Sequence, residues 1–102
     1  MSQGLDPVIH PPKRLAAMAL LAHATDADFR FLRDHLGVSD SDLSKQMSAL
    51  AEAGYVEVRK QGHGRGGVTT YRITRAGRRA YDAYRVTLEA LLSGSGLPTA
   101  QS

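Results

Sequence analysis

The sequence of 102 residues contains no cysteine, no tryptophan and only two phenylalanines. Without cysteine the chain cannot form a disulfide scaffold, a cysteine-ligated zinc site or a thiol nucleophile. Long apolar runs are also missing, since the run at residues 15–22 is far shorter than the ~20 residues of a membrane span. We therefore expect one small domain, in the common range of ~100–150 residues, with no membrane partner.

The apolar run at residues 15–22 has a second interpretation as part of a secretory signal peptide. Lys13 and Arg14 precede it, and the small-residue pair His23-Ala24 follows it. The run is close to the minimum length for such a region, however, and a long lead with two prolines precedes it. We expect a buried helix in a cytoplasmic protein instead.

Acidic residues are scarce in one half of the chain. The net charge of +3 divides into −3 for residues 1–58 and +6 for residues 59–102. From Arg59 to Arg85 a single acidic residue, Asp82, stands against eight basic ones. A basic half on a small domain suits a polyanionic partner.

Apolar residues recur at helical spacing in four segments of the sequence. They predict helices at about residues 12–23, 27–36, 40–53 and 75–92. Capping side chains precede the second, third and last of these helices, namely Thr25 or Asp26, Ser39 or Asp40, and Thr74. Only a three-residue Gly-Val-Ser turn separates the second helix from the third.

Between the third and last helices the apolar period changes from 3.6 to 2. This change predicts strands at residues 55–60 and 69–73. The segment QGHGRGG at 61–67 joins them as a flexible, glycine-rich tip, so the two strands form a β-hairpin.

The two ends of the chain show no periodicity. Residues 1–11 are expected to form a flexible N-terminal arm and residues 93–102 a disordered tail, on either side of one domain at 12–92. The predicted fold class is α+β, mainly α, with three helices, a β-hairpin and a C-terminal helix.

Three segments carry a resemblance to a known family: VSDSDLSKQMSAL at 38–50, AGYVEV at 53–58 and YRITRAGR at 71–78. In this order and at these spacings they resemble the winged helix-turn-helix transcriptional regulators of the MarR kind, particularly their short single-domain members. The resemblance implies a winged helix fold, binding to double-stranded DNA and dimerisation through the terminal helices.

The third helix would be the recognition helix in the major groove. With its leucines and methionine turned inward, its polar side chains face outward, where serine, glutamine and lysine can bond base edges or phosphates. The expected DNA-contacting residues are Ser41, Ser44, Lys45, Gln46 and Ser48. Asp42 at the edge of this face would repel phosphates unless it accepts from a cytosine amino group. An ordinary solvated face is the alternative.

The glycine-rich tip would be the wing. It places His63 and Arg65 on a thin backbone that suits a minor groove, whose negative potential attracts cations. Lys60 at the base of the tip suits a phosphate. The alternative is a mobile loop whose charge only aids solubility. Of the arginines that follow, we expect some to contact phosphates and others to be solvated: Arg72, Arg75, Arg78 and Arg79.

The last helix carries apolar residues at spacings of 3, 4 and 3, as in a short coiled-coil seam. Together with two residues of the first helix they are the expected dimer contacts: Leu15, Met18, Tyr81, Tyr84, Leu88 and Leu91. A homodimer would place two recognition helices about one DNA turn apart, on a pseudo-palindromic operator. The alternative is that this stripe packs on the first helix within a monomer.

Other function classes have little support. No histidine or acidic residue is spaced to activate a serine, and no phosphate-binding loop occurs, so we expect no enzyme and no cofactor. The four histidines, at 10, 23, 35 and 63, are scattered without an HxxxH motif, which argues against a metal site. Binding of a small-molecule effector is an open possibility, because Met18, Tyr81 and Tyr84 could line a dimer cleft that suits an aromatic ligand. The alternative is that these three residues are ordinary core residues.

The sequence thus predicts a cytoplasmic, nucleoid-associated regulator that represses or activates transcription by occupying DNA. The runner-up is a winged helix that binds another protein without binding DNA. Charge favours the first interpretation, because a protein adaptor has no need of Lys45, Lys60 and Arg65 on one surface.

Overall fold

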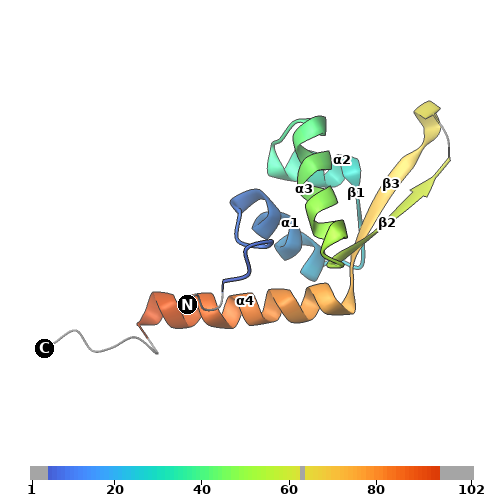
Figure 1. The fold of residues 1–102 in the computed structure, drawn as a ribbon. Coiled ribbons are helices and arrows are strands. Elements are labelled where there is room, and N and C mark those ends of the chain that lie inside the picture. The colour runs from blue at the N-terminus through green and yellow to red at the C-terminus, as the bar shows by residue number, and fades with distance from the viewer. Residues whose placement is uncertain (1–4, 63, 95–102) are drawn as a thin grey trace, which may run out of the picture.

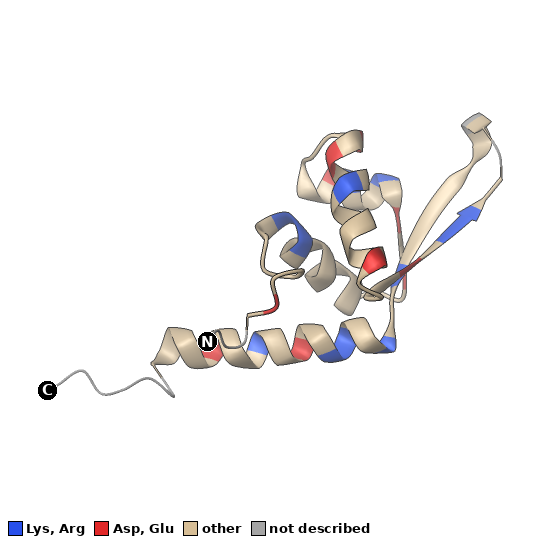
Figure 2. Cartoon of the chain, viewed as in Figure 1, with Lys and Arg blue, Asp and Glu red and all other residues tan. Residues whose placement is uncertain are grey.

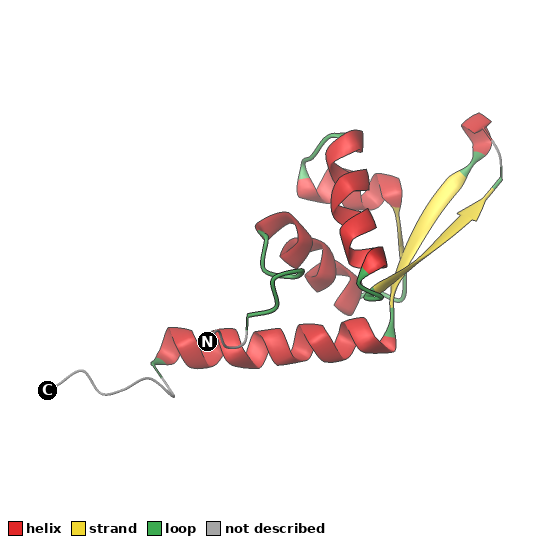
Figure 3. Ribbon diagram, in the orientation of Figure 1, coloured by secondary structure: helices red, strands yellow, loops and turns green. Residues whose placement is uncertain are grey.

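The structure is a computed structural model that describes residues 5–62 and 64–94. Figure 1 shows short helices gathered beside a longer one, α4, and a β-hairpin that projects from the end where α4 begins. The elements in chain order are α1 Pro12–Ala22, β1 Ala27–Asp28, α2 Phe29–Leu36, α3 Asp40–Glu52, β2 Val56–Gln61, the 3-10 turn η1 Gly64–Gly66, β3 Val68–Ile73 and α4 Arg75–Ser93. Helices dominate, as the predicted fold class requires (Figure 3). Most of the predicted tail, residues 95–102, lies outside the described residues.

The starts of α3 and α4 are the ones that the sequence predicts. The Ser39 side chain accepts a hydrogen bond from the Asp42 N–H at 3.1 Å, and the Thr74 side chain accepts one from the Gly77 N–H at 2.9 Å. Each cap satisfies a backbone donor that the first turn of a helix leaves free. α1 begins at the predicted Pro12, where a missing N–H costs nothing.

The start of α2 differs from the prediction. Neither Thr25 nor Asp26 caps this helix, because Asp28 does so by accepting a hydrogen bond from the Phe31 N–H at 2.8 Å. The residues just before α2 form strand β1, which pairs antiparallel with β3. A strand of two residues is too short to show a period of 2, so the apolar pattern placed residue 27 in the helix.

The strands form an antiparallel sheet in the order β1-β3-β2. In the β2–β3 hairpin Val56 pairs with Ile73 and Val58 pairs with Tyr71. Val56, Tyr71 and Ile73 are buried, whereas Val58 is 43% exposed. The alternation that predicts the strands therefore places side chains in the core only at the base of the hairpin, because the rest extends past the body of the domain (Figure 1).

The core lies where α1, α2 and α3 meet the base of the sheet and α4. Burial of each large apolar side chain contributes about 1.5–3 kcal/mol relative to its exposed state. The largest fully buried side chains are Ile9, Met18, Leu21, Leu32, Leu43, Met47 and Leu50. Tyr81 and Tyr84 complete this core from α4. Within the described residues no helix is long and apolar enough to cross a membrane.

Residues 5–11 are not a flexible arm, contrary to the prediction. Ile9 is 0% exposed, and the Asp6 carboxylate accepts a hydrogen bond from the Tyr55 hydroxyl at 2.6 Å. His10 Nδ1 lies 2.8 Å from the Tyr84 hydroxyl. An irregular segment has no apolar period, so periodicity could not reveal this packing. Residues 1–4 of the predicted arm lie outside the described part of the chain.

α4 crosses the chain between α3 and β2 at very short range. The Thr74 N–H donates to the Tyr55 carbonyl at 3.0 Å, and the Thr74 hydroxyl donates to the Gly54 carbonyl at 2.6 Å. A Cβ atom at Gly77 would lie only 2.1 Å from the Tyr55 carbonyl oxygen. Glycine is required here because any side chain would push α4 away from the backbone that it crosses.

We expect Gly77→Ala to lower the free energy of unfolding by about 3 kcal/mol, because the helix and the Tyr55 carbonyl must separate. Helix propensity alone would favour alanine by ~1 kcal/mol, so the sign of the change tests the contact. Urea unfolding measures it. Ala83→Gly, at an exposed position of the same helix, is the control and should cost only ~1 kcal/mol. A Gly77→Ala variant as stable as the original chain would contradict the close crossing.

The hydrogen bond between Asp6 and Tyr55 makes stability depend on pH. The bond to Asp6, then burial and the nearby carboxylate charge, raise the pKa of Tyr55 to about 12. Folding thus favours the protonated phenol. Its contribution to stability is complete below the unfolded pKa of ~10 and is lost as the pH rises through the folded pKa.

We expect Asp6→Ala to lower the pKa of the Tyr55 phenol toward the ordinary value of ~10, because the acceptor and its charge are removed. A pH titration followed by NMR, with the Tyr55 signal assigned from Tyr55→Phe, measures the shift. Asp82→Ala, on the surface of α4, should leave the pKa of Tyr55 unchanged. If Asp6→Ala also left this pKa unchanged, the bond between Asp6 and Tyr55 would not form in solution.

Candidate nucleic-acid interface

α2 and α3 form a helix-turn-helix. α2 ends at Gly37, whose φ of 66° is in the left-handed region and whose N–H donates to the Arg33 carbonyl at 2.9 Å. Glycine adopts this conformation without strain, so the chain turns within the three predicted residues. The inward face of α3 consists of the three residues expected there, Leu43, Met47 and Leu50, all buried.

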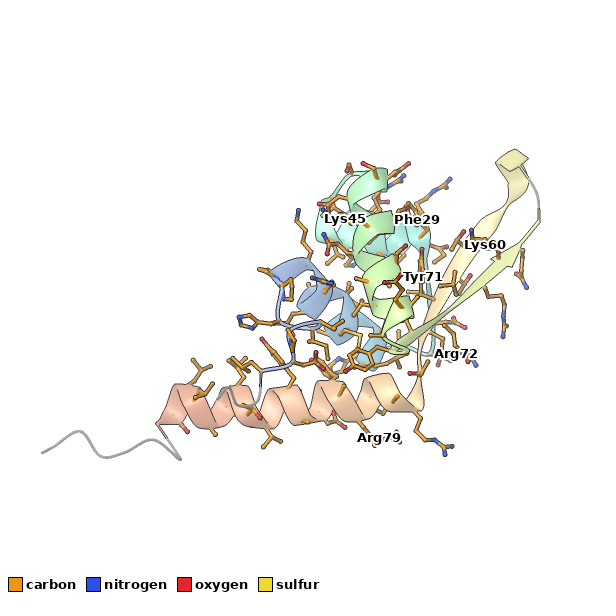
Figure 4. All side chains as sticks on the ribbon, in the orientation of Figure 1. Phe29, Lys45, Lys60, Tyr71, Arg72 and Arg79 are labelled. Carbon is orange, nitrogen blue, oxygen red and sulfur yellow. The ribbon has the colours of Figure 1, made fainter. Side chains whose placement is uncertain are left out.

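The opposite face of α3 is polar and open to solvent. Of the five residues predicted to contact DNA from this helix, four are exposed and Gln46 is half-buried at the edge. The exposed ones are Ser41, Ser44, Lys45 and Ser48. Three small hydroxyl side chains let another molecule approach the helix closely, and Lys45 adds a positive charge (Figure 4).

The beginning of α3 carries two carboxylates, and both are paired with cations. Asp42 forms an ion pair with Lys13 of α1 through one oxygen and accepts a hydrogen bond from Gln46 Nε2 at 2.9 Å through the other. These bonds, the one from Lys13 foremost, hold the pKa of Asp42 below its usual value. Asp40 pairs with Arg33 at 3.0 Å. Lys13 balances the charge of Asp42, whereas Asp40 shares the Arg33 cation with Asp34, which pairs with it at 3.1 Å.

The ion pair of Asp42 bears on two expectations from the sequence. The ion pair with Lys13 screens the repulsion of phosphates, while each oxygen keeps a second lone pair, so acceptance from a cytosine amino group stays a prediction. Sequence reasoning missed Lys13, which neutralises it. No local signal could have revealed this residue, because Lys13 in α1 and Asp42 in α3 are 29 residues apart in the sequence.

The β2–β3 hairpin is the wing, and it leaves the body of the domain beside α3. Lys60 is exposed and pairs in register with Thr69, which puts it on the same face of the hairpin as Tyr71. Near the tip the chain turns at Gly62, where φ is 81° and a Cβ atom would lie 3.0 Å from the Gly66 carbonyl oxygen. Figure 2 shows the basic stretch of β2 on the way to the tip.

Of the two remaining predicted wing residues, the structure describes only the backbone of Arg65. His63 lies outside the described residues. Arg65 lies in η1, and its backbone is at the extreme end of the hairpin (Figure 1). The backbone thus carries this arginine to the tip that the glycine-rich sequence predicts.

The six residues predicted as dimer contacts divide into two groups. Met18, Tyr81 and Tyr84 are 0%, 8% and 2% exposed, so they pack within the protomer, as the monomer alternative has it. Leu15 and Leu88 are half-buried, while Leu91 is 41% exposed. The stripe therefore begins as core and ends as surface, and Leu92, 78% exposed, widens its outer part.

Metal-binding residues do not gather in the described part of the chain. No group of three or more histidine, aspartate or glutamate side chains there could hold a metal ion. His23 and His35 instead bond through Nδ1 to the carbonyl oxygens of Ala19 and Phe31 in their own helices, at 2.9 and 3.3 Å.

Comparisons with known proteins agree with this geometry. Residues 13–92 match the family model of the winged helix DNA-binding domain. No curated protein shows a significant match to the sequence. The transcriptional regulator homologue from Pyrococcus horikoshii has a similar structure, with a TM-score of 0.79 and 24% identity over 88% of this chain and 89% of the other.

Two further solved structures are similar. The homodimeric winged helix-turn-helix DNA-binding domain from Mycobacterium bovis has a TM-score of 0.71 at 22% identity, over 90% of this chain and 82% of that one. ZitR from Lactococcus lactis, a zinc-responsive MarR family member, has a TM-score of 0.65 at 14% identity, over 92% of this chain and 64% of that one. At such identities the likeness is one of fold.

The winged helix part of the resemblance is therefore confirmed. The family model covers the helix-turn-helix, the wing and α4, which are the elements that carry the three sequence segments. The chain belongs to the winged helix DNA-binding domain family.

Proposed function

We propose that the protein is a sequence-specific transcriptional regulator that binds double-stranded DNA as a homodimer on a pseudo-palindromic operator. The observation that carries the proposal is the combination of a polar, open face on α3 with a basic wing beside it. An α-helix fits the major groove, which is ~12 Å wide, and a glycine-rich tip fits the narrower minor groove.

In this proposal α3 reads the bases. Ser41, Ser44 and Ser48 bond base edges or phosphates, and Lys45 reaches guanine acceptors or a phosphate. Gln46 uses one Nε2 hydrogen for Asp42, so its carbonyl oxygen remains to accept from a base amino group. The pairing of both acidic residues at the start of α3 supports the approach of phosphates, because it reduces repulsion.

The wing supplies contacts of a different kind. Lys60 neutralises a phosphate beside the groove that α3 enters, and Arg65 and His63 enter the adjacent minor groove at the tip. These contacts position the domain and add affinity, whereas α3 supplies the sequence preference.

A small-molecule effector stays a prediction of the sequence. The three residues considered as its site, Met18, Tyr81 and Tyr84, belong to the core of the protomer. An effector would therefore have to bind elsewhere or in a site that a second copy helps to form.

The homodimer would form through the outer part of α4. Leu88, Leu91 and Leu92 continue the buried stripe of Tyr81 and Tyr84 past the body of the domain, where they leave an apolar surface exposed. Leu15 of α1, which is half-buried, would lie at the edge of this dimer contact. The homodimeric structure from Mycobacterium bovis, similar over 90% of this chain, supports such an assembly.

DNA binding is tested by titrating random duplex DNA at increasing salt. Because DNA binding releases counterions, the logarithm of the association constant falls linearly with the logarithm of the salt concentration, with a slope of about −0.9 per phosphate contact. With Lys45, Lys60 and Arg65 of each protomer as phosphate or groove contacts, we expect a slope near −3 per bound protomer and about twice that for the homodimer, to be checked by fluorescence anisotropy. A flat salt response would favour the alternative function, a winged helix that binds another protein.

The same titration tests the wing. Arg65→Ala should weaken DNA binding by ~1–3 kcal/mol with the fold intact, because the tip loses its charge in the minor groove. Arg85→Ala removes an exposed arginine from α4 instead and is the matched control. Equal affinities of the Arg65→Ala variant and the original chain would remove the wing from the mechanism.

We expect the double variant Leu91→Asp and Leu92→Asp to be monomeric, because two buried charges would separate the helices of the dimer. Light scattering at the concentrations that bind DNA measures the mass. Val86→Asp is the control, since Val86 is 65% exposed on the other side of α4 and should leave the dimer intact. A monomeric original chain under these conditions would contradict the proposed assembly.

A further inference from the structure

Four arginines meet where β3 passes into α4. Arg72 lies on β3, and three more occur in the first five residues of α4, which begins RAGRR. We call these residues the α4 arginine cluster: Arg72, Arg75, Arg78 and Arg79. All four are exposed.

The cluster is only weakly neutralised by the protein itself. Arg72 pairs with Asp26 at 3.3 Å, and Arg78 donates to the Ala22 carbonyl at 3.3 Å. In the described part of the chain Arg75 and Arg79 have no hydrogen-bond or ion-pair partner for their side chains. Among the described residues Asp26 is thus the one carboxylate within 4 Å of these guanidinium groups. Glu57, opposite Arg72 in the hairpin, and Asp82, one turn past Arg78 and Arg79, lie further off.

The second half of α4 is arranged differently. Arg85 lies between two acidic residues of its own helix, 3.8 Å from Asp82 and 4.0 Å from Glu89. Both halves of the helix therefore carry exposed arginine, but only the first half leaves it available to another molecule.

The position of the cluster is unfavourable for the helix. The N-terminal turn has partial positive charge from its free N–H groups, so cations there are destabilising and acidic residues are stabilising. The first turn of α4 contains no acidic residue. Stability of the helix does not account for three arginines at this end, whereas an anionic partner would.

Arg79 lies away from the proposed operator contacts, whereas Arg72 belongs to β3, a strand of the wing. In Figure 4 Arg79 is on one side of α4, whereas Lys45, Lys60 and Arg72 are on the other. A duplex on α3 and the wing would therefore leave Arg75 and Arg79 free.

We propose that the α4 arginine cluster is a second phosphate-binding surface, which holds a second segment of duplex DNA and so lets the protein bridge two duplexes. This inference rests on the proposed function, in which the first duplex occupies α3 and the wing. Arginine suits the role because its planar fork bonds phosphate oxygens in pairs.

The shape of the cluster favours a polymer of phosphates over a single small anion. Arg75 and Arg79 stand one helical turn apart, which is ~6 Å along the axis, so they follow one face of α4. A row of exposed cations with no enclosing walls matches the closely spaced charges of a DNA backbone.

A capture experiment tests the inference. One duplex is fixed to beads, the full chain is added, and a second, fluorescent duplex is captured only if the protein bridges the two. We expect the double variant Arg75→Glu and Arg79→Glu to capture about tenfold less, while its affinity for a single duplex in anisotropy changes less than about threefold. Arg79→Glu alone should show an intermediate loss.

Arg85→Glu is the matched control for Arg79→Glu, because it makes the same charge change on the same helix at an arginine that is already paired. The Arg85→Glu variant should capture as much of the second duplex as the original chain does. The double variant should also unfold at an equal or higher temperature, since acidic residues suit the start of a helix. This readout separates loss of binding from loss of fold.

Several results would overturn the inference. Equal capture by the double variant would remove the cluster from bridging, and a parallel loss of single-duplex affinity would place the cluster in the operator contact. An original chain that binds one duplex but captures no second one, while polyglutamate binds through the cluster, would assign the surface to an acidic protein. An original chain that binds no duplex at all would overturn the proposed function with it.

Discussion

The approach of α4 to the backbone at Gly54 and Tyr55 is the contact on which the rest of the structure depends. The absent side chain of Gly77 allows it, and the Thr74 hydroxyl secures it by donating to one carbonyl and accepting from the N–H of its own helix. The same short stretch ends α3 and begins β2. One junction therefore sets the positions of α3, the wing and α4 relative to each other.

Much of this arrangement could be predicted from local sequence signals. The spacing of Leu43, Met47 and Leu50 identified both faces of α3, and Ser39 and Thr74 marked two helix starts correctly. These signals work because a helix repeats every 3.6 residues and because its first turn needs a side-chain acceptor. The candidate DNA-binding face followed directly from them.

The features that escaped prediction depend on contacts between distant segments. Strand β1 exists because β3 pairs with it, and Lys13 matters because α1 ends up beside Asp42. The apolar stripe of α4 was recognised, but its period could not show where burial stops. That limit is set by the size of the domain, which covers Tyr84 and leaves Leu91 in solvent.

Ile9 has a consequence for how this domain can be separated from its surroundings. The family match spans residues 13–92, yet this fully buried side chain lies before it and is held by the anchors at Asp6 and His10. A fragment trimmed to the matched segment would open a hole in its own interior, with a cost on the scale of ~2–5 kcal/mol for a deleted aliphatic side chain. The shared family segment alone would therefore be less stable than a chain that keeps residues 5–12.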